Sequence, residues 1–318
     1  MVEIGYALSS EEHAPNNLVQ YAQRAEEVGF TFALISDHYH PWIDRQGNSP
    51  FVWSVIGGIA QITKHLCLGT GVTCPTIRIH PAIIAQAAAT AASMMPGRFF
   101  LGVGTGENLN EHILGDRWPP TEIRLEMLEE AVEIIRLLWQ GGTQSYWGHY
   151  YTVENARIYT LPDKLPRIMV AASGLKAAER AGEIGDGFIS TAPDPELLKK
   201  FESGAGRSKP SYGQLAVCWG SDEIEARRIA YEWWPNTAVK GELTVELPTP
   251  AHFEQAADMI TEEDVAEKVV CGPDPERHLT EINKFVDAGY NHVYIHQIGP
   301  DQEGFFQFYR QEILPKFR

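Results

Sequence analysis

The chain is short of basic residues, and the balance of its charges restricts its partners. Its 26 Lys and Arg residues are outnumbered by 42 Asp and Glu residues, which gives a formal net charge of −16. Such an excess of negative charge repels phosphate backbones and anionic membrane surfaces, so we expect neither a nucleic-acid nor a membrane partner. An anionic cofactor would have to be held by local backbone donors or by a few placed cations.

Cysteine and long apolar runs are also scarce. The four cysteines have neither CxxC nor zinc-knuckle spacing. The first residues resemble a strand and not a signal peptide, which predicts a reduced, cytoplasmic setting. Every apolar run ends well short of the ~20 residues that cross a bilayer, so no membrane span is predicted.

The 318 residues have the composition of an ordinary globular protein, with 44% hydrophobic and 21% charged residues. Strand-like and helix-like segments alternate, which is typical of a parallel sheet covered by helices. The expected strands are 2–7, 32–35, 66–72, 99–103, 167–171, 187–190, 214–219 and 292–296. The expected helices are 16–28, 52–63, 81–94, 121–139, 175–182, 195–203, 223–234 and 275–288.

This alternation fits either a closed (β/α)8 TIM barrel or a doubly wound sheet, and the number of units and the length favour the barrel. We expect a single α/β domain over residues 1–318. Two insertions interrupt it: residues 140–166 look like a hairpin cap, and residues 235–271 are expected to form a lid or binding loop. In a barrel the carboxyl ends of all strands meet at one face, so the residues that follow the strands are the candidates for chemistry.

The segment after the second strand brings several reactive side chains to one strand end: Asp37, His38, His40 and Trp42. Two alternating histidines are how many metal-dependent barrel hydrolases begin. A metal site needs further ligands on later strand ends, and the sequence offers mainly His296, so we predict none. A purely structural interpretation, with a capping aspartate and buried rings, stays open.

Glycines and small polar residues follow the next strands. Gly71 suggests close backbone approach, with Thr73 as a hydroxyl donor. The glycine-rich loop 102–111 lacks the spacing of a Rossmann motif, and its Glu107 could donate or accept a proton. Residues 171–174 open a helix and present backbone N–H groups to an anion. Each segment also has a plainer interpretation, as a glycine kink, a solvated carboxylate or a helix cap.

Taken together, these segments resemble one family. The resemblance is carried by residues 36–42, 102–110, 171–174 and 185–189. These segments resemble the F420-dependent glucose-6-phosphate dehydrogenase group of the bacterial luciferase-like superfamily. The resemblance implies a (β/α)8 barrel with insertions, usually a homodimer, that binds the deazaflavin coenzyme F420 at the carboxyl face of the barrel.

By the same resemblance, His38 acts on the reacting hydroxyl as general base or orienting group, and Glu107 protonates the reduced ring of F420. Trp42 would lie near the substrate carbon and Glu11 near the sugar. The implied cofactor contacts are Asp37, Gly71, Val72, Thr73, Thr105, Gly106, Asn110, Ala172, Ser173, Gly174 and Thr191. The peptide between Gly71 and Val72 matches one that is often cis in the family.

The sequence departs from the family at the pocket for the substrate phosphate, where the glucose-6-phosphate enzymes use two lysines and an arginine. Asp194 and Thr244 stand near the lysine positions, and Lys268 stands near the arginine. Lys199, Lys240 and Lys268 could compensate as point charges, and we predict that the last two contact the substrate.

The predicted activity is hydride transfer from the carbinol carbon of a sugar or sugar phosphate to F420. A base for the hydroxyl proton, a proton donor for the acceptor ring and exclusion of water are what such a step requires. An F420-dependent secondary alcohol dehydrogenase is the first alternative. A flavin-dependent monooxygenase and a metal-dependent hydrolase are further ones.

Overall fold

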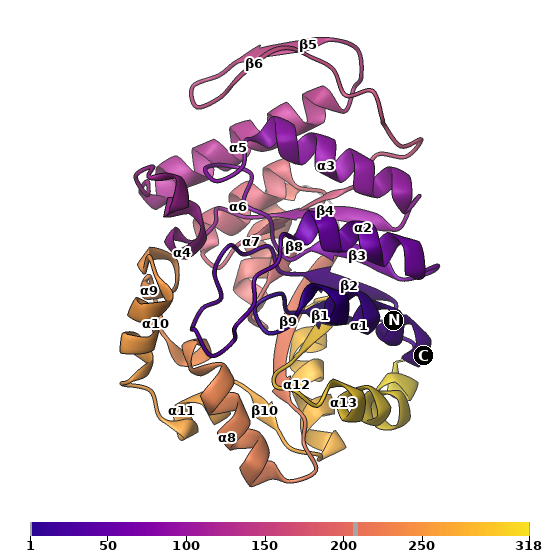
Figure 1. Ribbon diagram of the computed structural model, residues 1–318, viewed down its shortest axis with the longest axis vertical. Coiled ribbons are helices and arrows are strands. Elements are labelled where there is room, and N and C mark those ends of the chain that lie inside the picture. Colours follow the sequence, from indigo (N-terminus) through magenta and orange to yellow (C-terminus); the bar gives the residue numbers. More distant parts are fainter. Residues whose placement is uncertain (1, 206–208, 318) are drawn as a thin grey trace.

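The computed structural model describes residues 2–205 and 209–317 and forms a closed barrel of parallel strands surrounded by helices (Figure 1). Within these residues the strands follow one another around the barrel, and β8 pairs with β9 to close it. The predicted (β/α)8 fold is therefore confirmed. The barrel strands are β1 (Glu3–Leu8), β2 (Phe32–Ile35), β3 (Cys67–Thr70), β4 (Phe99–Val103), β7 (Ile168–Ala171), β8 (Gly187–Ser190), β9 (Ser211–Cys218) and β11 (His292–Gln297).

Outer helices follow the strands as predicted, with ends that differ by a few residues. On α5 the spacing of Leu125, Leu128 and Val132 places one apolar stripe against the barrel, and all three are buried. No helix in the described part of the chain is long and apolar enough to cross a membrane. The outer helices are α1 (Pro15–Val28), α2 (Val52–Ile62), α3 (Pro81–Met94), α5 (Thr121–Leu138), α6 (Leu175–Ile184), α7 (Pro195–Ala205), α8 (Glu223–Trp233), α12 (Pro275–Asp287) and α13 (Gln302–Phe308).

Aromatic rings fill the barrel, and glycines on the strands make room for them. A Cβ on Gly5 would lie 2.4 Å from the ring of Phe32, and one on Gly69 would lie 2.0 Å from the ring of Phe100. The prediction that β9 begins at residue 214 is wrong, because Gly213 belongs to the strand and leaves space for Phe285. A barrel that is solid inside leaves the loops at the strand ends to form a site.

The first insertion is a hairpin, as predicted, of β5 (Gln144–Trp147) and β6 (Thr152–Ala156). It lies along α5 in Figure 1, where the Glu130 carboxylate accepts backbone N–H groups of residues 149–151. The hairpin thus packs on the side of the barrel.

The second insertion is mostly helical. It consists of the 3-10 turn η2 (Pro235–Ala238), α9 (Leu243–Glu246), α10 (Pro250–Ala257), α11 (Glu262–Ala266) and the short strand β10 (Val270–Cys271). In Figure 1, α9 and α10 lie near the short helix α4 (Asn108–Glu111), at the end of the barrel away from both chain termini. The insertion therefore stands at the face where the strand-end loops gather.

Candidate active site

The loop after β2 begins with a buried aspartate that already has protein partners. Asp37 is 4% exposed. Its carboxylate accepts hydrogen bonds from Thr73 Oγ1, at 2.7 Å, and from Arg78 Nη2, at 3.0 Å. Two predicted cofactor contacts, Asp37 and Thr73, are thus brought together from β2 and β3.

His38 follows, and its imidazole has an unsatisfied nitrogen. The side chain is 9% exposed, and Glu11 Oε1 lies 3.4 Å from Nδ1. This approach lacks hydrogen-bonding geometry, so Nδ1 has no hydrogen-bond partner among the described residues. Ser49 Oγ donates to the carbonyl of His38 at 2.7 Å and fixes its backbone. A buried polar atom without a partner is costly unless a ligand completes it.

Glu11 is buried behind His38 and is held by hydroxyl groups. Ser36 Oγ donates to its Oε2 at 2.7 Å, and Ser9 Oγ does so at 3.1 Å. Burial alone would raise the pKa of Glu11, but the proximity of His38 and the bond from Ser36 outweigh it, so the pKa lies below its ordinary value. Glu11 is therefore a carboxylate at neutral pH, and it faces the imidazole of His38.

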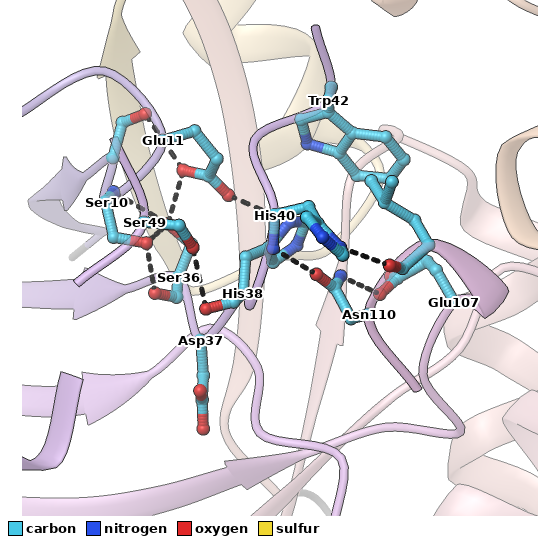
Figure 2. Close-up of polar contacts among 12 residues, drawn as sticks. Ser10, Glu11, Ser36, Asp37, His38, His40, Trp42, Ser49, Glu107 and Asn110 are labelled. Atoms are coloured by element: carbon cyan, nitrogen blue, oxygen red, sulfur yellow. Dashed lines mark hydrogen bonds and ion pairs between the residues drawn. The ribbon is translucent and has the colours of Figure 1, made fainter. Parts of the chain in front are cut away.

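On the other side of His38, the loop after β4 contributes Glu107 and Asn110, as Figure 2 shows. Asn110 Oδ1 accepts the backbone N–H groups of Tyr39 and His40, at 2.8 and 3.1 Å. Its Nδ2 donates to Glu107 Oε2 at 3.3 Å. Asn110 therefore joins the two loops, and it places the Glu107 carboxylate on the side of His38 opposite Glu11.

Arg78 and Glu111 complete this network, and sequence reasoning missed both. Arg78 donates its backbone N–H to Glu111 Oε2 at 2.8 Å, while its guanidinium lies against Asp37. Burial raises the pKa of Glu111 to about 7, with Glu107 and Asp37 adding to the rise and Arg78 opposing it. The spacing of four between Glu107 and Glu111 could have indicated a shared helix face. No sequence motif marks Arg78.

Two glycine positions lie in close contact with neighbouring side chains, and a Cβ on Gly71 would stand 2.9 Å from Leu34. The peptide between Gly71 and Val72 is cis, in agreement with the resemblance. Gly106 has a φ of +77°, and a Cβ there would lie 2.6 Å from Cys74 Sγ. The neighbouring Thr105 is half-buried. These segments end β3 and β4, which are adjacent in the sheet.

The loops after β7 and β8 carry the remaining predicted cofactor contacts. Ala172 is half-buried, whereas Ser173, Gly174 and Thr191 are exposed. Gly174 is the N-cap of α6, and no side chain caps that end, so the possibility of a serine cap at Ser173 is not realised. The first N–H groups of α6 thus lack a cap from the side chain of the N-cap residue, and uncapped N–H groups at a helix start can bind an anion.

The two lysines predicted to bind substrate are not brought to this cluster. Lys240 is exposed and acts on Asp264, whose pKa is lowered mainly by hydrogen bonds from Thr261 and further by the lysine charge. Lys268 is exposed in a surface groove with Glu276, between α11 and α12. In the described part of the chain neither lysine forms a hydrogen bond or ion pair with the strand-end residues.

Apolar residues, among them one from the second insertion, cover Trp42, whose ring lies beside the imidazole of His38. The ring centroids of His38 and Trp42 are 5.1 Å apart, and Phe253 of α10 meets Trp42 edge-on at 5.0 Å. Phe253 is fully buried and packs with Ile43 and Leu109. The insertion thus shields one side of the candidate site from water.

His40 is not arranged to bind one metal ion together with His38. Its Nδ1 lies 2.9 Å from the carbonyl oxygen of Leu109. In the described residues no group of three or more His, Cys, Asp or Glu side chains could hold a metal ion. His296 instead contacts Glu12 at 2.9 Å inside the barrel.

The arrangement provides an imidazole supported by one carboxylate, a second carboxylate on a neighbouring loop and an indole, all at one end of the barrel. The imidazole can take a proton from a hydroxyl group, and Glu11 can stabilise the positive charge that results. Glu107 can exchange a proton with a separate acceptor. These groups can handle the protons of an alcohol oxidation, and the hydride would need a separate acceptor.

Comparison with known proteins agrees with this chemistry. The chain is 37% identical to the F420-dependent glucose-6-phosphate dehydrogenase of Microbacterium testaceum, over 100% of this chain and 98% of the relative. It is 38% identical to the F420-dependent hydroxymycolic acid dehydrogenase of Mycobacterium tuberculosis, over 99% of this chain and 88% of the relative.

Among solved structures, an F420-dependent secondary alcohol dehydrogenase in complex with an F420–acetone adduct matches with a TM-score of 0.92 and 30% identity. That match covers 100% of this chain and 99% of the other. The model of the luciferase-like monooxygenase family matches residues 1–292. The chain therefore belongs to the luciferase-like monooxygenase family.

Proposed function

We propose that the chain is an F420-dependent dehydrogenase that transfers a hydride from the carbinol carbon of a sugar or sugar phosphate to F420. The observation that carries the proposal is the buried Nδ1 of His38, which has no hydrogen-bond partner among the described residues although Glu11 Oε1 lies 3.4 Å away. Because Nδ1 faces the Glu11 carboxylate, a substrate hydroxyl would meet the other nitrogen of the ring. The full-length similarity to F420-dependent dehydrogenases supports the cofactor.

The residues at the strand ends fit this cofactor. When bound, F420 supplies a deazaflavin ring that accepts the hydride. Gly71, Val72 and Gly106 would form the wall against the ring by the family resemblance, with which the cis peptide between Gly71 and Val72 agrees. Ser173 and Gly174, at the start of α6, would hold a phosphate of its tail with backbone N–H groups.

Four residues of the site then have defined tasks. His38 takes the proton of the substrate hydroxyl, and the Glu11 carboxylate stabilises the imidazolium. Glu107 donates a proton to the reduced ring. Trp42, covered by Phe253, excludes water from the reacting carbon.

A secondary alcohol is the second candidate substrate. The positions of Lys240 and Lys268, both exposed and unconnected to the strand-end network, favour it, because a phosphate needs cationic partners. The solved structure with an F420–acetone adduct gives the same indication.

We further propose a cytoplasmic homodimer that binds neither nucleic acid nor membranes. Helices α2 and α3 contain no charged residue, although the chain carries a net charge of −16. Ile83 and Met94 of α3, and Phe51 before α2, are exposed. A second copy would cover this uncharged face. All four cysteines are free thiols, as in a reducing compartment.

The experiment is to mix purified protein with F420 and to follow the loss of its absorbance on addition of glucose 6-phosphate, glucose or isopropanol. We expect stoichiometric reduction by at least one of them. Absence of reduction, together with oxygen consumption in the presence of reduced flavin, would instead identify a monooxygenase.

A further inference from the structure

Glu12 is a buried carboxylate that the proposed reaction does not use. Its side chain is 0% exposed. Trp234 Nε1 donates to its Oε1 at 2.6 Å, and His296 Nε2 lies 2.9 Å from the same oxygen. The backbone N–H of Gly299 donates to Oε2 at 2.8 Å. Partners on both oxygens fix the direction of this carboxylate.

These contacts attach the second insertion to the barrel. Trp234 is the residue at which α8 ends and η2 begins, and its indole also stands edge-on to His296, with ring centroids 4.5 Å apart. His296 lies on β11, and Glu12 follows β1. The start of the insertion is therefore tied through Glu12 to two neighbouring strands.

Gln46 continues this connection toward the candidate active site. It is 2% exposed. Its Nε2 donates to the carbonyl of Trp233 at 3.0 Å and lies 3.4 Å from Asn236 Oδ1. Its Oε1 accepts the backbone N–H of Trp42 at 2.8 Å. One buried amide thus joins the first turn of the insertion to the tryptophan beside His38.

The loop that contains Gln46 also donates hydrogen bonds to the backbone of Glu11 and Glu12. The backbone N–H of Asn48 donates to the carbonyl of Glu11 at 3.0 Å. Its Nδ2 donates to the carbonyl of Glu12 at 3.1 Å. The carboxylate of Glu11 faces His38. This network of hydrogen bonds therefore connects Trp42 with the carboxylate beside His38.

Trp42 is consequently held by the insertion in two ways. Gln46 fixes its backbone, and Phe253 of α10 packs on its ring at 5.0 Å. A misplacement of about 1 Å in a substrate-positioning group can cost on the order of 100-fold in rate. The seating of the insertion is thus able to set the geometry of the site.

We propose that Glu12 and Gln46 are positioning residues, which seat the insertion through Trp234 and thereby hold Trp42 against His38. This inference rests on the proposed function, because Trp42 is assigned to the substrate carbon. Neither Glu12 nor Gln46 touches the substrate. Both act through Trp42.

The test compares Trp234→Phe and Gln46→Met with the neighbouring control Trp233→Phe. Phenylalanine at 234 keeps the ring but lacks the N–H that reaches Glu12, and methionine at 46 keeps the length but accepts no bond from Trp42. Hydrogen exchange of the Trp42 amide is measured in the protein without cofactor. We expect at least about tenfold faster exchange in both test variants and no change in the control.

Turnover is then measured per F420-occupied site, with the substrate that reduces F420 best. We expect kcat/KM to fall about tenfold or more in each test variant, with the Kd for F420 within about twofold of wild type. Because both residues act through one connection, kcat/KM of the double variant should be no lower than that of the less active single variant. A merely structural role would lower the number of occupied sites and leave turnover per site unchanged.

The outcomes separate this inference from the function on which it rests. If wild-type protein fails to bind or reduce F420, the proposed function is wrong. If wild type turns over but the Trp42 amide and kcat/KM of both test variants match the control, the positioning network is wrong. Additive losses in the double variant would also overturn it, because they would mean two independent effects.

Discussion

His38 Nδ1 and Glu11 Oε1 lie 3.4 Å apart, both side chains are buried, and the imidazole nitrogen has no hydrogen-bond partner among the described residues. The pair joins the loop after β2 to the loop after β1. Because Nδ1 faces this carboxylate, Glu11 can stabilise the positive charge that forms when His38 takes a proton from a hydroxyl group.

Removal of either proton-handling group should slow the reaction without releasing the cofactor. We expect His38→Ala and Glu107→Gln each to lower kcat by roughly 10²- to 10⁴-fold, with the Kd for F420 nearly unchanged. Steady-state kinetics and fluorescence titration of F420 measure the two quantities. Parallel losses of turnover and affinity would mean that the roles are assigned wrongly.

Glu11→Gln tests the support that the carboxylate gives to His38. The pKa of Glu11 is depressed, so its charge is present at neutral pH and is lost only as the pH falls below the ordinary range for a glutamate. We expect the variant to lose about tenfold or more in kcat between pH 6 and 8. A pH–rate profile identical to that of wild type would contradict the role.

The buried carboxyl of Glu111 should make stability depend on pH. Its pKa is raised to about 7, so the folded protein binds a proton that the unfolded chain releases above about pH 4.3. Stability from this group is therefore full at low pH and falls, by at most about 1.4 kcal/mol per pH unit, as the pH rises to about 7. Denaturant unfolding of wild type and Glu111→Gln between pH 5 and 8 isolates the effect. A constant difference between the two would refute it.

Arg78 should matter far more for stability than a surface arginine. Arg78→Met leaves the carboxylate of Asp37 buried without its cation, which costs about 3–5 kcal/mol. The control Arg45→Met breaks the exposed pair with Glu232 and should cost at most about 1 kcal/mol. Equal losses in denaturant unfolding would show that Arg78 is dispensable.

A charged residue on the uncharged face of α2 and α3 tests whether that face forms the dimer interface. Ile83→Glu should convert a dimer into a monomer, measured by sedimentation at micromolar concentration, because a buried unpaired carboxylate opposes association. Ile224→Glu on α8, where the side chain is also exposed, is the control and should leave the dimer intact. A monomeric wild type would end the homodimer proposal.

Much of the architecture could be predicted from the sequence, because buried parallel strands are short apolar runs and the outer helices carry one apolar stripe. The strands 32–35, 99–103 and 187–190 match the structure at both ends. His38 and Glu107 were identified because each follows such a run. The fold alone then places both at the same end of the barrel.

The partners of these residues could not be predicted in the same way. Arg78 meets Asp37, and Trp234 meets Glu12 across 222 residues, only because the barrel closes and the insertion folds back. The substrate contact predicted for Lys268 depended on similarity to the family, and the structure exposes that side chain between α11 and α12.

In the proposed reaction a hydride passes directly from a carbinol carbon to F420. The most direct measurement is a single turnover with the most active substrate deuterated at that carbon, followed by mass spectrometry of the cofactor. We predict one deuterium on the reduced deazaflavin ring and slower reduction than with the unlabelled substrate. Reduced cofactor that carries no deuterium, or no reduction by any alcohol or sugar, would contradict the account.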